Sequence, residues 1–260
     1  MSLHYPGTRR ERILGYGLHG AGKSSIWLCI AEWIYKTQGP EHLWVVDADN
    51  AWDAMRPEDG HLDTIVNQFP IYDYGDYKDA VKKIRENALR DDWYVFDRID
   101  PLWDRAQEAY SQNVEGEDLD EFFLRHEIAG SSPGGDYGKR WVQIRRMYHG
   151  MGIDLVNTFR GHVLALAFAK EIKEKSGQFG DDAEVYKKYL PVRMKPAGKD
   201  DLPGLFHTEI FMQESPSGYR MTTLKERKPF SGGGRTMMKG KIVTPDFVMA
   251  YLIGEAGWKL

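Results

Sequence analysis

Short apolar runs alternate with longer amphipathic stretches along most of the chain. The apolar runs, typical of buried strands, occupy positions 13–16, 43–46, 93–96 and 163–169. Between them, apolar residues at three- and four-residue spacing predict helices over 26–34, 77–90 and 136–159. Strands that alternate with helices in this way are typical of an α/β domain with a mostly parallel sheet.

The pattern changes toward the C-terminus, where two further strand-like runs lie close together. Residues 206–212 and 218–224 flank Pro216-Ser217-Gly218, a turn sequence that predicts an antiparallel hairpin. Thr244-Pro245-Asp246 then predicts the start of a last helix that runs to residue 253. We therefore expect one α/β domain over residues 1–260, with its core at about 11–253. Its central, mostly parallel sheet is expected to be flanked by helices and to carry a C-terminal β-hairpin.

A glycine-rich sequence directly follows the first predicted strand. Residues 17–24 read G-L-H-G-A-G-K-S and fit the phosphate-loop pattern G-x-x-x-x-G-K-S/T at every position. Glycines let successive backbone N–H groups turn toward phosphates, and the helix that follows directs its positive end at the same place. The predicted ATP-binding residues are Gly17, Leu18, His19, Gly20, Ala21, Gly22, Lys23, Ser24 and Ser25. Within this set we expect Lys23 to contact the β- and γ-phosphates and Ser24 to bind Mg²⁺.

A second motif ends the third predicted strand. Four apolar residues at 93–96 lead into Asp97, about 75 residues after Lys23, which is the pattern of a Walker B strand. A carboxylate at the tip of such a strand holds the water shell of magnesium. The sequence therefore predicts a Mg²⁺ site made by Ser24 and Asp97.

The stretch over residues 45–53, V-V-D-A-D-N-A-W-D, resembles the segment F-I-D-A-E-H-A-L-D of bacterial RecA. The chain is thus similar to RecA-like P-loop ATPases. The resemblance implies that Asp49 orients the attacking water, in place of the glutamate of that family. Asp47 and Asp53 are the alternatives for the catalytic base. At the tip of the next core strand, where RecA-like proteins usually place Gln, Asn or His, this chain has Lys170.

Lys225 and Arg227 follow the predicted hairpin with one residue between them. They are similar to the K-x-R pair of RecA-like ring and filament ATPases, which reaches the γ-phosphate on the neighbouring subunit. The resemblance therefore implies a homo-oligomer, either a ring or a short filament; a solvated basic strand end is the alternative. Over residues 11–253 the chain most resembles the short RecA-like ATPases of tailed phages that are grouped with single-strand annealing proteins.

RecA-like proteins hold single-stranded DNA with the loops after the Walker B strand and after the next core strand. The first equivalent, residues 104–136, is acidic, and we interpret it as a solvated or partner-facing segment. The second contains the predicted DNA-binding residues Lys187, Lys188, Arg193 and Lys195, interleaved with the aromatic residues Tyr186 and Tyr189. A generic polar loop explains this segment equally well. Residues 231–235 form a second basic candidate, with a surface loop as the alternative.

Composition narrows the class of protein. The formal net charge is −4, so any DNA contact is confined to local basic segments. The single cysteine, Cys29, excludes an internal disulfide, and no apolar run nears the roughly 20 residues of a membrane span, so the expected location is the cytoplasm. We expect a Mg²⁺-dependent ATPase that acts on single-stranded DNA in phage or bacterial recombination, annealing or repair. The alternatives are a nucleotide-gated assembly, helicase or packaging motor, and a small-molecule P-loop kinase.

Overall fold

The computed structural model describes residues 10–128, 136–172, 187–216, 218–226 and 242–243. Its strands are β1 (Arg12–Gly17), β2 (Leu43–Asp47), β3 (Val66–Pro70), β4 (Trp93–Asp97), β5 (His162–Glu171), β6 (Met194–Pro196), β7 (Thr208–Ser215), β8 (Gly218–Glu226) and β9 (Ile242–Val243). Its α-helices are α1 (Ser25–Thr37), α2 (Ala51–Met55), α3 (Tyr74–Asn87), α4 (Leu102–Tyr110), α5 (Leu119–Ile128), α6 (Asp136–Tyr148) and α7 (Asp154–Thr158). Arg227, residues 231–235 and the predicted last helix at 244–253 lie outside the described residues.

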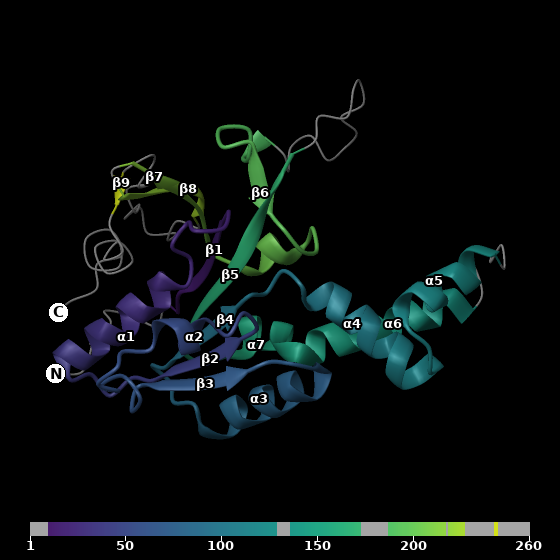
Figure 1. The fold of residues 1–260 in the computed structure, drawn as a ribbon, viewed down its shortest axis with the longest axis horizontal. Helices are drawn as coiled ribbons and strands as arrows, with labels where there is room; N and C mark the ends of the chain where they lie inside the picture. The colour runs from purple at the N-terminus through teal and green to yellow at the C-terminus, as the bar shows by residue number, and fades with distance from the viewer. Residues whose placement is uncertain (1–9, 129–135, 173–186, 217, 227–241, 244–260) are drawn as a thin grey trace.

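The strands form one sheet in the order β3-β2-β4-β5-β1-β7-β8-β9, and β6 pairs with the end of β5. In this spatial order, each pair of adjacent strands from β3 through β2, β4, β5 and β1 to β7 is parallel. The predicted hairpin is confirmed, because β7 and β8 pair antiparallel, with Ser215 opposite Gly218. The sheet and its flanking helices therefore confirm the α/β fold class expected from the sequence (Figure 1).

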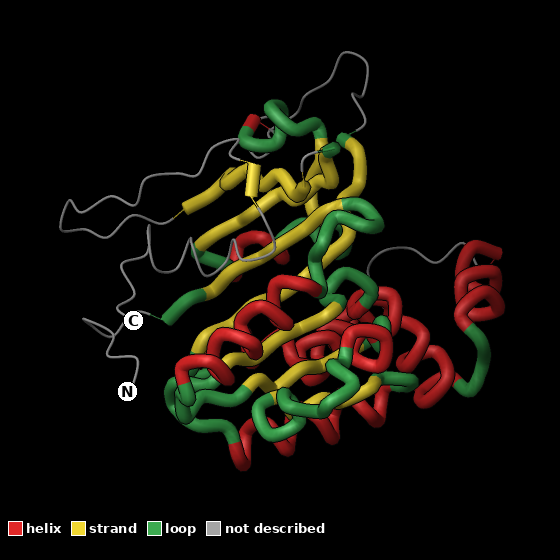
Figure 2. Tube along the Cα trace, turned by 60° about the vertical axis from the view of Figure 1, so that its left-hand side comes forward, coloured by secondary structure: helices red, strands yellow, loops and turns green. Residues whose placement is uncertain are grey.

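Side chains of the central strands alternate between two apolar layers, one on each face of the sheet. On one face, Ile30 of α1 belongs to the same cluster as Val45 and Val95. On the other face, Val81 of α3 belongs to a larger cluster with Phe96, to which α4, α6 and α7 also contribute. Figures 1 and 2 show the result, a sheet with α1 on one side and α3 on the other. Successive side chains of a strand point to opposite faces, so strands that are buried throughout, as β1 and β4 are, require cover on both faces of the sheet.

The strand register brings two distant strand ends to one edge of the sheet. Leu166 of β5 pairs with Gly15 of β1 on one side and with Asp97 of β4 on the other. The carboxyl ends of β1 and β4 therefore flank β5, and the loops that follow them meet there. This edge is where ligands bind in open parallel sheets.

The single helix predicted over residues 136–159 is wrong. The chain instead forms α6, a π-helical segment at His149–Ile153, and α7. The cause lies at Gly152, whose φ of 116° no longer follows the helix. A Cβ at this position would collide with the hydroxyl of Tyr94 and lie 2.9 Å from the ring of Phe96. The interruption lets the backbone pass close to these buried rings.

Two further features of the fold do not follow from the sequence patterns. β3 is an edge strand that pairs with β2 alone and is only half buried, so its apolar pattern is weak. Residues 104–128, the described part of the acidic segment 104–136, are mostly helical and include most of α4 and all of α5; the interpretation of this segment as solvated or partner-facing stays a prediction. Figure 1 shows α5 and the adjoining part of α6 extending beyond one end of the sheet.

No helix in the described ranges combines the length and the apolar character that crossing a bilayer requires.

Position 162, at the start of β5, is occupied by a buried histidine. The Nδ1 atom of His162 accepts a hydrogen bond from the backbone N–H of Glu11 at 3.3 Å, and its ring stacks on Trp93. Burial lowers the pKa of His162 from 6.5 to about 4. The folded protein therefore holds this ring neutral over a pH range in which the unfolded chain protonates it.

We expect the free energy of unfolding to fall as the pH drops from about 6.5 to about 4, because the unfolded chain binds this proton first. His162→Gln retains an acceptor for Glu11 but does not titrate. Over this range it should lose less stability than the wild type, by on the order of 3 kcal/mol. Chemical denaturation at a series of pH values measures the difference. His149→Gln, at a surface histidine, is the matched control, and equal pH slopes for His162→Gln and wild type would contradict the prediction.

Candidate functional site

The glycine-rich loop lies between β1 and α1, at the carboxyl edge of the sheet. Gly17 has no room for a side chain, because a Cβ there would collide with the carbonyl oxygen of Met212 on β7. Gly22 has a φ of +76°, and a Cβ there would lie 3.0 Å from the ring of Tyr219 on β8. Backbone packing and a left-handed conformation therefore require the two glycines at the ends of the motif.

The amino end of α1 retains its positive character. Ser24 occupies the cap position, its side chain makes no capping hydrogen bond, and the first turn holds no acidic residue. No side chain of Ser24 or of the first turn therefore offsets the positive end of the helix dipole, which suits the binding of an anion. The Ser24 hydroxyl is likewise not used for capping.

Lys23 lies largely buried within the loop. Its Nζ donates to the carbonyl oxygens of Gly17 at 3.3 Å and Leu18 at 2.8 Å. Burial lowers the pKa of Lys23, while the negative charge of Asp97 opposes that change. The ammonium group also lies 4.4 Å from the centroid of the Phe168 ring, near the end of β5. Lys23 is therefore a buried cation held mainly by backbone oxygens and an aromatic face.

Asp97, at the tip of β4, is fully buried. Its Oδ2 accepts a hydrogen bond from the indole N–H of Trp27 on α1 at 3.0 Å. Its Oδ1 is also buried and makes no well-formed hydrogen bond among the described residues. Burial raises the pKa of Asp97 from 3.8 to about 6, although the nearby Ser24 hydroxyl and the Trp27 indole oppose this change.

An oxygen of this kind fits a hard divalent cation, which would compensate the buried charge. Within the part of the chain that the structure describes, no cluster of three His, Cys, Asp or Glu side chains is arranged to hold a metal. A cation at Asp97 therefore needs further oxygen ligands from a bound anion or from water. That requirement matches the way magnesium binds with nucleotide phosphates.

The carboxylates predicted as alternative bases occupy different environments. Asp47 is fully buried and accepts hydrogen bonds from the backbone N–H groups of Ala51 and Trp52 at 2.9 and 3.0 Å. Asp47 thus fixes the start of α2. Asp53 is exposed on α2. Asp49 lies between them and is the one that faces the loop cavity.

A cavity of about 300 Å³ gathers most of the predicted nucleotide-binding residues. It is lined by His19, Gly20, Ala21, Gly22, Lys23, Ser24, Ser25, Asp49, Phe168 and Tyr219. Phe168 and Tyr219 were not predicted from the sequence, because they come from the distant strands β5 and β8. The one usable signal for Phe168 was its position at the carboxyl end of a buried strand.

Arg98 is a further site residue that the sequence reasoning missed. It directly follows Asp97, and its Nη1 donates to Asp49 at 3.0 Å while its Nη2 donates to Asp100 at 2.9 Å. Its guanidinium lies 3.8 Å from the centroid of the Phe168 ring. The signal in the sequence was a basic residue between two aspartates just after the strand tip.

Lys225 and two of the predicted DNA-binding residues, Lys188 and Lys195, line a separate cavity of about 530 Å³. Lys188 and Lys225 both approach the buried carboxylate of Glu209, at 2.8 and 3.5 Å, and Lys195 pairs with Asp200 at 2.9 Å. Lys187 and Arg193 are exposed and do not line this cavity. Lys170 donates to the carbonyl oxygen of Gly198 at 3.2 Å.

The expectation that Tyr189 is available for base stacking is wrong. The side chain is 2% exposed, and its hydroxyl donates to Glu209 at 3.0 Å. Its ring also lies edge-on to Tyr16 of β1. Tyr189 is therefore part of the core, because its ring fills space beneath β1 and its hydroxyl satisfies a buried carboxylate. Tyr186 lies outside the described residues.

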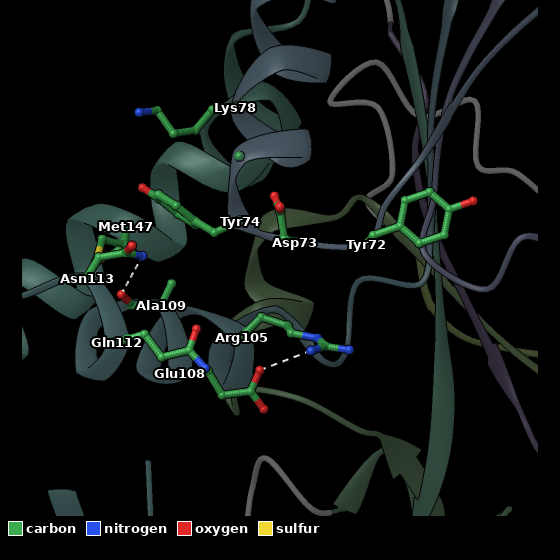
Figure 3. A pocket seen from close by; sticks show the side chains of 11 residues that line it. Tyr72, Asp73, Tyr74, Lys78, Arg105, Glu108, Ala109, Gln112, Asn113 and Met147 are labelled. Atoms are coloured by element: carbon green, nitrogen blue, oxygen red, sulfur yellow. Dashed lines mark hydrogen bonds and ion pairs between the residues drawn. The ribbon is translucent and has the colours of Figure 1, made fainter. Parts of the chain in front are cut away.

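A larger cavity of about 710 Å³ lies beside the amino end of α3 and is shown in Figure 3. Lys78 and Arg105 line it together with Asp73 and Glu108. These charges are already partly used, since Arg105 pairs with Glu108 at 3.0 Å and Asp73 caps α3. The charges that line this cavity are of both signs and partly paired, so they do not select one class of ligand.

The fold and the site together define an α/β protein with a phosphate-loop motif at the carboxyl edge of a parallel sheet. No protein-family model matches the chain, and no curated protein sequence matches it. Among solved structures, the crystal structure of the RadB recombinase is similar over 90% of this chain and 87% of that one, with a TM-score of 0.44 and 9% sequence identity. A likeness at that level carries no argument about function, which we therefore infer from the site.

The buried charge of Asp97 leads to a prediction about stability. Because its pKa in the folded protein lies above 3.8, the free energy of unfolding falls as the pH rises from about 4 to about 6 and stays lower above that. Asp97→Asn removes this cost and retains an acceptor for Trp27. It should raise the free energy of unfolding at pH 7.5 by on the order of 2 kcal/mol in metal-free buffer.

Chemical denaturation of Asp97→Asn and wild type at pH 7.5 and pH 4 measures this effect, which should vanish at the lower pH. Asp79→Asn, on the exposed face of α3, is the control and should leave stability unchanged. A less stable Asp97→Asn protein at pH 7.5 would show that the ionised carboxylate is well compensated in the fold.

Proposed function

We propose that this protein is a RecA-like, Mg²⁺-dependent ATPase that acts on single-stranded DNA in phage or bacterial recombination, annealing or repair. One observation carries the proposal: the glycine loop, the uncapped amino end of α1, Lys23 and Asp49 line one cavity at the edge of the sheet. Asp97 lies near Lys23 and Ser24, and its buried Oδ1 makes no well-formed hydrogen bond among the described residues. Each of these groups suits a triphosphate and its cation.

In this proposal each residue of the site has its own role toward the nucleotide and its cation. The N–H groups of the loop and the Lys23 ammonium bind the phosphates of ATP. Ser24 and Asp97 hold Mg²⁺, which shields the negative charge of the phosphates. Asp49 orients the attacking water, whereas Asp47 is engaged at the start of α2.

The DNA-binding part of the proposal is supported by local basic charge. Lys188, Lys195 and Lys225 surround one cavity, and Lys187 and Arg193 are exposed beside it. In a chain of net charge −4, such a cluster confines the contact with phosphate to a small area. Because Tyr189 is buried, backbone phosphates rather than stacked bases dominate this contact.

Assembly is part of the same proposal. Lys225 and Arg227 complete the ATP site of a neighbouring protomer in a ring or short filament in the cytoplasm. Within its own chain, Lys225 donates to the carbonyl oxygen of Pro203 at 2.5 Å and approaches Glu209, so the trans contact requires this lysine to exchange partners.

ATP turnover in the presence and absence of single-stranded DNA tests the proposed activity. Wild type should hydrolyse ATP faster with DNA, and Lys23→Ala should reduce turnover by on the order of 100-fold, since it removes a charge that faces the phosphates. Lys36→Ala is the matched control, because that lysine is exposed on the last turn of α1. Arg227→Ala should abolish turnover while leaving ATP binding intact. Turnover that does not change with DNA would favour an assembly or packaging motor.

DNA binding is tested separately from turnover. Removing Lys187 and Arg193, both exposed, should weaken binding to single strands of any sequence. It should also reduce the slope of log affinity against log salt by about 0.7 per lost phosphate contact. Fluorescence anisotropy with a labelled oligonucleotide at several salt concentrations measures both. Lys82→Ala with Lys83→Ala, on α3, controls for net charge, and an equal loss in that double variant would contradict the assigned position.

A further inference from the structure

Arg98 joins three strand ends at the edge of the cavity. It follows Asp97 at the tip of β4, and it pairs with Asp49, which lies just after β2. Its guanidinium covers the ring of Phe168, near the end of β5. Arg98 thus contacts two side chains that line the loop cavity, Asp49 and Phe168, although it is not itself part of the loop.

The two carboxylates that Arg98 contacts are held very differently. Asp100 is 8% exposed, pairs with Arg98 at 2.9 Å, and also accepts the backbone N–H of Phe168 at 3.2 Å. The side chain of Asp49 is 39% exposed, and among the described residues it forms a hydrogen bond only with Arg98. Asp100 therefore anchors the guanidinium, while the bond to Asp49 is the one that water or another anion displaces more easily.

Phe168 brings a second cation to the same place. Its ring has the Arg98 guanidinium at 3.8 Å and the Lys23 ammonium at 4.4 Å from its centroid. Phe168 and Asp49 both line the loop cavity with Lys23. Two cations therefore converge on one aromatic ring at the mouth of a site whose loop already favours an anion.

We propose that Arg98 is a second cationic binding residue for the nucleotide, supplied by the same chain, and that the terminal phosphate of a bound triphosphate competes with Asp49 for its guanidinium. The inference rests on the proposed ATP site. A triphosphate takes Arg98 and releases the Asp49 carboxylate, whereas a diphosphate leaves the Arg98–Asp49 pair intact. Asp49 is then free to orient water only when there is a terminal phosphate to attack.

Equilibrium binding of a non-hydrolysable ATP analogue and of ADP, each with Mg²⁺, tests this competition without relying on turnover. Arg98→Ala should weaken binding of the analogue about tenfold and change ADP affinity less than about twofold. Unchanged ADP affinity also shows that the variant is folded. Arg98→Lys, which retains the charge, should recover part of the loss, and Arg105→Ala, on α4, is the control at a neighbouring surface arginine.

The pair of residues gives a second, independent readout. Asp49→Asn should tighten binding of the analogue, because Arg98 no longer has a charged competitor, and this gain should disappear in the Arg98→Ala background. An equal gain in both backgrounds would mean that Asp49 acts by general repulsion, and the inference would be wrong. Equal losses for analogue and ADP in Arg98→Ala would also overturn it. If wild type bound neither nucleotide, the proposed function itself would fail, and the inference with it.

Discussion

The hydrogen bond from Trp27 to Asp97 connects the two halves of the site. Trp27 lies in the first helical turns after the phosphate loop, and Asp97 ends β4, which is separated from β1 by β5. A fully buried indole fixes the position of α1 relative to the β4 tip, and hence the distance between the loop and the carboxylate. Trp27 also packs on Trp52 of α2. Asp49 lies just before α2, so the same tryptophan also helps to position the segment that carries Asp49. This contact therefore helps to fix the relative positions of the loop, Asp97 and Asp49.

Several charged side chains lie close to the Trp27–Asp97 hydrogen bond, and the stability of the fold does not require them. Asp97 is buried with an elevated pKa, Lys23 is buried with a lowered one, and Arg98 bridges two further carboxylates. Apolar residues at these positions would give a more stable domain, because burying charge is unfavourable unless it is compensated. Groups held at such cost are typical of a binding site, where the missing compensation comes from the ligand.

Local sequence patterns predicted the parts of the site that are contiguous in the chain. The loop at residues 17–24 was recognisable because backbone geometry dictates its glycines, and Asp97 because a carboxylate ends an apolar strand. Arg98 and Tyr219 were missed, since their relevance depends on side-chain packing between strands that the sequence does not order. The break at Gly152 was missed for a similar reason: the rings of Tyr94 and Phe96 that require it lie in another strand. The same limit applies to Tyr189, whose burial depends on contacts with β1 and Glu209.

The hairpin links the loop to the basic cavity through a single strand. At one end of β8 the ring of Tyr219 lies against Gly22, and near the other end Lys225 approaches the buried Glu209 that Lys188 also contacts. β8 pairs with β7 along its length, and at Tyr219 and Arg220 it also pairs with β9. The ring of Tyr219 fills the space over Gly22, so β8 packs directly against the phosphate loop. The same strand therefore contributes one residue to the lining of the loop cavity and one to the lining of the basic cavity.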